Sequence, residues 1–271
     1  MSDNISQILD YVKEQRAVDF NAYRPDTIKR RLDLRLHSVG VSGYNSYLQY
    51  LKENPHEIEG LIDTLTIKVS HFFRNPFVFE ILKKFVLPEL IERRPGDGLR
   101  IWCAGCARGE EAYSTAILLN EIMREELLFT HLFLLATDID RNALGAGQNA
   151  VYTDEALSKV KKGYFDRYFT AEGDSYRLKD EIRAMVTFAR HDITTCKPPK
   201  EGIFSNYHII LCRNVLIYLD RYTQGKVLES LSEFLLNKGY LILGEAETIP
   251  QELSGDFYEV IPHTKVFRKG I

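Results

Sequence analysis

The chain has 271 residues, 45% of them hydrophobic and 27% charged, with a formal net charge of −3 at pH 7. This length suits one large domain or two modest ones, and the acidic balance argues against a protein that depends on coating nucleic acid or anionic lipid. No apolar run approaches about 18 residues, no signal-peptide pattern opens the chain, and the four cysteines have no disulfide-framework spacing. We therefore expect a reduced, cytoplasmic protein that does not insert into a membrane.

The first 75 residues are predicted to form an all-α domain. Apolar residues at positions 5, 8, 9 and 12 recur at helical spacing, and residues 27–37 (TIKRRLDLRLH) place Ile28, Leu32 and Leu36 on one helix face. Two further helices are expected on either side of Asn54-Pro55. The helix over residues 27–37 also presents four cations on its other faces, namely Lys29, Arg30, Arg31 and Arg35.

From residue 98 onward, apolar strands alternate with amphipathic helices. This pattern predicts βαβ units, a parallel sheet and a ligand site at the carboxyl ends of the strands. The alternation pauses at residues 152–187, where a helical piece (KVKKGYFDRYF) and two strands (SYRL and AMVTFAR) predict a small antiparallel insertion. It resumes at YHIILC. We expect residues 76–271 to form one α/β domain with that insertion.

The cysteine pair in WCAGCARGEE raises the question of a metal or redox site. Zinc requires four ligands, yet Cys196 and Cys212 are isolated and the seven histidines form no matching pair. A redox dithiol belongs at the start of a helix, whereas the helix predicted here begins later, at Gly109. We therefore predict no metal site and interpret Cys103 and Cys106 as packing residues.

The same stretch fits a nucleotide-binding loop, because a strand leads through Gly105 and Gly109 into a helix. Glu110 and Glu111 open that helix; they would repel a phosphate but suit a cation, although acidic residues also simply stabilise a helix N-terminus. Asp138 ends the next strand, where a carboxylate can accept hydrogen bonds from ribose hydroxyls. A cationic ligand with a ribose points to S-adenosylmethionine (SAM), and therefore to a SAM-dependent methyltransferase.

Four motifs in order, TIKVSHFFR, WCAGCARGEEAYS, ATDID and CRNVLIY, resemble the chemotaxis receptor methyltransferases of the CheR family. The resemblance covers nearly the whole chain, including the insertion. It implies a protein-glutamate O-methyltransferase (EC 2.1.1.80) with an all-α N-terminal domain and a Rossmann-like SAM-binding domain. The product of its cofactor would be S-adenosylhomocysteine.

The resemblance also implies the site residues. Arg74, beside the reacting carboxylate, and Tyr218, close to the transferred methyl group, are the implied catalytic residues. The implied cofactor-binding residues are Lys68, Ser70, Arg74, Gly105, Glu111, Asp138, Asp192, Ile193, Arg213 and Asn214. Among these, Asp138 is the ribose ligand, and Asp192 with Ile193 forms the adenine-side pair.

The chain departs from the family pattern at several positions. Lys68 stands where many relatives have Asn, and Ala112 replaces a common proline. The family's usual Gly-His-Ser-Glu is here Gly244-Glu245-Ala246-Glu247, which puts the role of that turn in doubt.

The implied partners are chemoreceptors. Their glutamate side chains, with a pKa of about 4.3, are ionised at neutral pH and need no strong general base. The cationic helix over residues 27–37 is either a solvated face or a docking surface for the acidic methylation region of a receptor. In some relatives the insertion binds a peptide at the receptor C-terminus by strand addition. We expect a monomer.

Three rival functions remain at this stage. A nucleic-acid amino-methyltransferase would need an Asn/Asp-Pro-Pro-aromatic signature after the fourth strand, where this chain has Cys212-Arg213-Asn214-Val215. A small-molecule methyltransferase would not need the basic helical domain. A SAM-sensing scaffold would bind the cofactor without transferring a methyl group.

Overall fold

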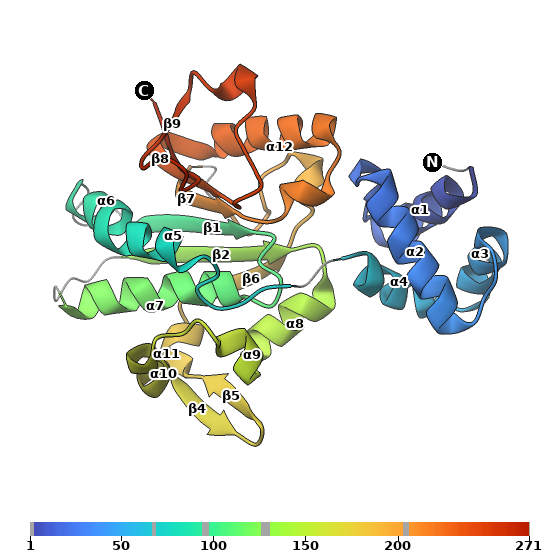
Figure 1. The fold of residues 1–271 in the computed structure, drawn as a ribbon, viewed down its shortest axis with the longest axis horizontal. Coiled ribbons are helices and arrows are strands. Elements are labelled where there is room, and N and C mark those ends of the chain that lie inside the picture. The colour runs from blue at the N-terminus through green and yellow to red at the C-terminus, as the bar shows by residue number, and fades with distance from the viewer. Residues whose placement is uncertain (1–2, 67–68, 94–97, 126–130, 203–205, 271) are drawn as a thin grey trace. The chain divides into compact units, whose positions relative to one another are not determined.

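The computed structural model describes residues 3–66, 69–93, 98–125, 131–202 and 206–270. The chain divides into two compact units (Figure 1). The helical unit comprises residues 1–67 and 216–226, and the sheet unit comprises residues 68–215 and 227–271. The helical unit is therefore built from two separate stretches of the sequence.

The helical unit confirms the all-α prediction. Its elements are α1 (Asp3–Arg16), η1 (Phe20–Ala22), α2 (Pro25–Val39), α3 (Tyr44–Glu53) and α4 (Glu57–Leu65). Ile28, Leu32 and Leu36 are buried along one face of α2, as their spacing predicts. The helix ends at Gly40, whose φ of +71° is the left-handed conformation that glycine adopts without a Cβ penalty.

Two of the four cations predicted for the other faces of α2 bind within this unit. Arg35 donates to both carboxylate oxygens of Glu57, at 2.7 and 2.6 Å, and Tyr47 donates to the same carboxylate at 2.8 Å. Gly60 makes this possible, since a Cβ there would lie 2.0 Å from Nη2 of Arg35. Arg31 donates to the carbonyl of Thr64 at 3.4 Å. Lys29 and Arg30 remain exposed.

The second stretch of the helical unit joins the first through backbone hydrogen bonds. The η4 turn (Leu216–Tyr218) precedes α12 (Arg221–Phe234), which begins in this unit and continues into the sheet unit. Arg24 donates its backbone N–H to the carbonyl of Tyr218 at 2.9 Å and its Nε to that of Leu219 at 3.2 Å. Asp220 donates back to the carbonyl of Ala22 at 3.0 Å.

The sheet unit contains a seven-stranded sheet in the order β6-β2-β1-β7-β8-β10-β9. Its strands are β1 (Leu99–Ala104), β2 (Leu132–Asp138), β6 (Val186–Arg190), β7 (Tyr207–Cys212), β8 (Leu235–Leu243), β9 (Phe257–Glu259) and β10 (Val266–Lys269). The pairs from β6 to β8 are parallel, and β10 is antiparallel to both of its neighbours. This mostly parallel sheet confirms the predicted α/β class.

Alternate side chains of β1 pack on opposite faces of the sheet. Ile101 and Cys103 belong to a core shared with α5 (Pro76–Ile81), the π-helical turn η2 (Leu82–Val86), α6 (Leu87–Arg93) and α7 (Glu110–Glu125). The ring of Trp102, between them, lies 6.3 Å from that of Phe234 in α12. The helix α8 (Arg141–Asn149) follows β2.

The insertion has its own three-stranded antiparallel sheet, in the order β3-β5-β4. Its elements are β3 (Val151–Tyr152), α9 (Asp154–Leu157), α10 (Lys162–Tyr168), β4 (Phe169–Glu172), β5 (Ser175–Leu178) and α11 (Asp180–Arg183). The predicted strand SYRL is β5, but AMVTFAR is not part of this sheet: it supplies β6, which pairs in parallel with β2. The true partner of β5 is β4, and Gly173, with a φ of +59°, allows the tight turn between them.

Two short 3₁₀ turns complete the fold, η3 (Ile193–Thr195) after β6 and η5 (Gln251–Leu253) after β8. Over the residues that the structure describes, no helix combines the length and the apolar character needed to cross a membrane.

Candidate active site

The loop after β1 lies close to the chain segment that follows β7. Gly105 and Cys106 donate their backbone N–H groups to the carbonyl of Thr137, at 2.8 and 2.9 Å, which fixes the loop beside the end of β2. Gly105 has a φ of +75°, and a Cβ on it would lie 2.2 Å from Cγ2 of Val215. This position therefore excludes side chains on both conformational and steric grounds.

Two carboxylates open α7, that of Glu110 buried and that of Glu111 partly buried. Glu110 is 2% exposed, and no hydrogen-bond partner for its Oε2 is found among the described residues. Burial raises the pKa of Glu110 above its ordinary value of 4.5, while a hydrogen bond with the Ser70 side chain opposes the rise. Burial likewise raises the pKa of Glu111, against the opposing positive charge of Arg213. The two carboxylates are thus groups that a nearby cation would stabilise.

Arg213 joins α7 to the segment that precedes α5. Its Nη1 lies 2.8 Å from Oε2 of Glu111, and its Nη2 donates at 2.9 Å to both the carbonyl of Arg74 and Oδ1 of Asn75. Its guanidinium also lies 5.6 Å from the centre of the Phe79 ring. With 5% of the residue exposed, Arg213 acts chiefly as a buried link between the cofactor side of the site and Arg74.

The segment with Ser70 and Arg74 is anchored by its two phenylalanines. Phe72 and Phe73 are buried, with their rings against Tyr152 and Phe79 respectively. The backbone N–H of Phe73 donates to Oγ of Ser114 in α7 at 2.8 Å. Arg74 stays partly exposed, and its Nη1 donates to the carbonyl of Val69 at 2.9 Å. The anchoring thus positions Arg74 at the edge of the site.

Asp138 ends β2 and holds two backbone groups. Its Oδ2 accepts from the N–H of Ala107 at 2.8 Å, and its Oδ1 accepts from the N–H of Asp140 at 2.9 Å. A carboxylate offers about four lone-pair sites, so capacity remains for ribose hydroxyls. Burial raises the pKa of Asp138 above 3.8, against these backbone hydrogen bonds.

Asp192 and Ile193 follow β6, the strand next to β2 in the sheet. Oδ1 of Asp192 accepts from the backbone N–H and the hydroxyl of Thr194, at 2.9 and 2.7 Å, and so begins the η3 turn. His191 donates its backbone N–H to the carbonyl of Asp138 at 3.0 Å, which ties the two strand ends together. The predicted adenine-side pair thus stands one strand away from the predicted ribose ligand.

Not every predicted site residue falls in this cluster. Tyr218 belongs to the helical unit. The sheet unit contains Ser70, Arg74, Gly105, Glu111, Asp138, Asp192, Ile193, Arg213 and Asn214. Lys68 lies outside the described residues. The sequence reasoning missed Asn75, whose side chain also donates to Glu245, and it left Glu247 without a role. The sequence did offer one signal for these two positions, namely that Glu245 and Glu247 stand two residues apart after β8.

The cysteine thiols remain interpreted as packing groups, although the backbone N–H of Cys106 helps to fix the loop after β1. Cys103, Cys106 and Cys212 are buried, and burial raises the pKa of each thiol well above its ordinary value. No group of three or more His, Cys, Asp or Glu side chains able to hold a metal ion occurs among the described residues.

Comparison with known families identifies the family of this chain. Residues 68–266 match the model of the CheR methyltransferase SAM-binding domain, and residues 3–66 match that of the CheR methyltransferase all-alpha domain. The chain belongs to the CheR methyltransferase family. It is therefore a SAM-dependent methyltransferase, and the resemblance of its four motifs to this family is confirmed.

Relatives of similar length include proteins named chemotaxis protein methyltransferase. A chemotaxis protein methyltransferase of Listeria innocua is 30% identical over 238 residues, which are 88% of this chain and 87% of that protein. Chemotaxis protein methyltransferase 2 of Vibrio cholerae is 29% identical over 264 residues, 96% of this chain and 88% of that protein. An uncharacterised 104.1 kDa protein of Rhodobacter capsulatus is 30% identical over 251 residues, but this chain spans only 26% of it.

Among solved structures, the N-methyltransferase NodS of Bradyrhizobium japonicum, in complex with S-adenosyl-L-homocysteine, is 15% identical with a TM-score of 0.40. The likeness covers 73% of this chain and 88% of that one, and it is too weak to add to the assignment.

The residues of the CheR site fit SAM, whose ammonium and sulfonium are both cationic. Glu110 brings a buried carboxylate oxygen with no hydrogen-bond partner in the part of the chain that the structure describes, and Glu111 and Asp138 add two carboxylates whose pKa values burial raises. A bound cation offsets the cost of keeping these groups ionised away from water.

We expect SAM binding to weaken as the pH falls. Below their raised pKa values Glu110, Glu111 and Asp138 take up protons, so the site loses the negative charge that attracts the cofactor. Without ligand, the same three groups make the free energy of unfolding depend on pH in the opposite direction. Their stabilising contribution is fully present below their ordinary pKa values and is lost as the pH rises through the raised ones. Calorimetric titration with SAM between pH 5 and 8 measures the first effect. Glu110→Gln should bind more weakly at pH 8 and show a smaller pH dependence.

Proposed function

We propose that this protein methylates glutamate side chains of chemoreceptors, giving glutamyl methyl esters and S-adenosylhomocysteine. The observation that favours a carboxylate acceptor is Arg74: its backbone carbonyl is fixed by Arg213, while its side chain stays partly exposed beside the cofactor residues. An arginine presents a planar, two-donor fork that matches a carboxylate. The chemotaxis names of the Listeria and Vibrio relatives support receptors as the substrate class.

The proposed reaction needs orientation more than acid–base catalysis. Bound SAM supplies a methyl group on a sulfonium. An acceptor carboxylate oxygen, already ionised at neutral pH, forms the new O–CH₃ bond as the S–CH₃ bond breaks, and the negative and positive charges cancel in the products. Nη1 of Arg74 donates to the Val69 carbonyl, and its Nη2 and Nε are proposed to hold the acceptor in line. Tyr218 is proposed to shape the path of the methyl group.

One experiment tests this function. The protein is incubated with radiolabelled SAM and with membranes that contain candidate chemoreceptors. Label that appears on a receptor and is released by mild base supports a methyl ester. Base-stable label, or SAM binding with no transfer to any receptor, contradicts the proposal and favours an amino-group acceptor or a SAM-sensing scaffold respectively.

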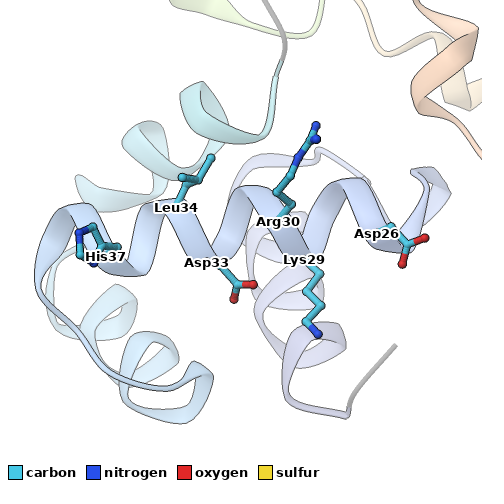
Figure 2. Close-up of a pocket in the computed structure, with 6 residues that line it drawn as sticks. All are labelled: Asp26, Lys29, Arg30, Asp33, Leu34 and His37. Carbon is cyan, nitrogen blue, oxygen red and sulfur yellow. The ribbon is translucent and has the colours of Figure 1, made fainter.

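We also propose that α2 docks on the acidic, glutamate-bearing helices of the receptor. A shallow groove of about 390 Å³ lies along this helix. Among the residues that line it, Arg30 and Leu34 point to one side and Lys29 and Asp33 to another (Figure 2). Leu34 is 58% exposed, so the Arg30 side offers an apolar contact beside a cation. That pairing suits an amphipathic helix with acidic residues at its edge.

Charge reversal on α2 is expected to slow receptor methylation. Arg30→Glu should raise the KM for receptor severalfold and remove most of its dependence on salt, because the attraction between Arg30 and an acidic helix becomes repulsion. Lys52→Glu, on the exposed part of α3, is the matched control. Methylation rates measured from 50 to 300 mM salt provide the check, and equal rates for wild type and Arg30→Glu would contradict docking through this face.

We propose that the insertion adds a second contact with the receptor. The strand β4 is at the edge of the β3-β5-β4 sheet, and three of its four residues are exposed. An open antiparallel edge can accept an extended peptide by strand addition. This supports the proposal that a receptor C-terminal peptide binds here.

A further inference from the structure

A buried turn after β8 lies outside the proposed reaction, yet it holds the segment that leaves β7. Glu247 is 4% exposed, and its backbone N–H donates to the carbonyl of Gly244 at 3.0 Å. Its carboxylate accepts three backbone N–H groups: Oε2 from Gly244 at 2.6 Å and from Asn214 at 2.9 Å, and Oε1 from Val215 at 2.9 Å. One side chain therefore ties two chain segments that are 30 residues apart.

These hydrogen bonds fix a conformation that the backbone does not prefer. Asn214 has a φ of +61°, the left-handed region, which costs a non-glycine residue free energy and persists only where surrounding contacts enforce it. The carboxylate supplies such contacts, because it pairs two consecutive N–H groups that would otherwise be left without protein acceptors. Space is also tight: a Cβ on Gly244 would lie 2.8 Å from the backbone nitrogen of Asn214.

The residues on either side of Asn214 reach different parts of the site. Arg213 binds Glu111 and the carbonyl of Arg74, and Val215 packs its Cγ2 where any side chain on Gly105 would have to go. A change in the turn would therefore move the cofactor loop and the Arg74 segment together.

We infer that Glu247 is a positioning residue for methyl transfer: by fixing the Asn214–Val215 backbone it sets the SAM-binding loop through Val215 and Arg74 through Arg213. The part that concerns Arg74 rests on the proposed function, whereas the part that concerns SAM does not.

The test is Glu247→Gln, in which an NH₂ group replaces one acceptor oxygen and faces a backbone N–H. Glu121→Gln is the matched control: Glu121 is 5% exposed in the same unit and accepts from Arg167 and Tyr168, neither of which is among the predicted site residues. Affinity for SAM is measured by calorimetry without receptor, kcat and KM for SAM are measured with receptor, and thermal unfolding is recorded for each variant.

We expect Glu247→Gln to weaken SAM binding at least tenfold and to lower kcat as well, while Glu121→Gln keeps wild-type affinity even with a comparable loss of stability. Glu247→Asp keeps the charge but reaches less far, so its affinity for SAM should lie between those of wild type and Glu247→Gln. It serves as the test if the Gln variant does not fold. Wild-type SAM affinity in the folded Gln variant, or in the Asp variant when that one is used, overturns the inference. If the wild-type protein labels no receptor, the proposed function fails, but the binding comparison still decides the role of Glu247.

Discussion

Arg74→Ala is expected to lower the rate of receptor methylation at saturating SAM by about 100- to 1,000-fold, the usual effect of removing a donor that stabilises a reacting centre. The link to Arg213 uses the backbone carbonyl of Arg74, which the substitution retains, and the side chain donates a hydrogen bond to the carbonyl of Val69. Folding should therefore be preserved while the acceptor carboxylate loses its fork of donors.

Two variants sharpen this prediction. Arg74→Lys keeps the charge but not the planar fork, and it should recover only part of the rate. Arg124→Ala changes an exposed arginine in the last turn of α7 and should behave as wild type. Initial rates of transfer from radiolabelled SAM and the thermal unfolding temperature are the two measurements. An unchanged turnover in Arg74→Ala would exclude the catalytic role.

Gly105→Ala is expected to reduce SAM affinity by at least about tenfold and to destabilise the protein by roughly 2–4 kcal/mol, from left-handed strain and overpacking together. The added Cβ would meet Cγ2 of Val215 at 2.2 Å, so the loop after β1 or the turn after β7 must move. The double variant Gly105→Ala/Val215→Ala removes the clash but not the strain at φ +75°, and it should recover SAM binding in part.

Gly145→Ala is the control for this pair. Gly145 is within α8, and nothing would lie within 4 Å of its added Cβ, so we expect unchanged SAM binding and a gain of about 0.5–1 kcal/mol from the better helix former. Calorimetric titration with SAM compares four proteins, namely wild type, Gly105→Ala, the double variant and Gly145→Ala. Failure of Val215→Ala to restore any affinity would show that the contact with Val215 is not what excludes a side chain at Gly105.

Local patterns were enough to predict the elements of this fold. The spacing of Ile28, Leu32 and Leu36 specified the buried face of α2, since helical periodicity depends only on residues within a few turns. The positions of Gly105 and Asp138 at strand ends followed from the strand–loop–helix pattern, because the carboxyl ends of neighbouring parallel strands meet at one edge of the sheet.

Contacts between distant segments were beyond the reach of the same reasoning. The inward turn of Arg35 depends on Glu57 and on the space left at Gly60, more than twenty residues away. The strand AMVTFAR was assigned to the wrong sheet because half-buried alternation identifies a strand but not its partner. The linking role of Arg213 likewise arises from three partners that only the folded chain brings together.

The hydrogen bonds between residues 22–24 and 218–220 have a consequence for dissecting the protein. A truncation between the two matched regions, near residue 67, would separate the two stretches of the helical unit, because residues 216–226 would lose the backbone partners supplied by Arg24 and Ala22. Leu216 and Leu219, which are 2% and 1% exposed in the intact chain, would be left without part of their cover. The boundary between the two family-model matches thus differs from the boundary between the compact units, and we expect an exchange of N-terminal regions between relatives to succeed only when residues 216–226 are exchanged with them.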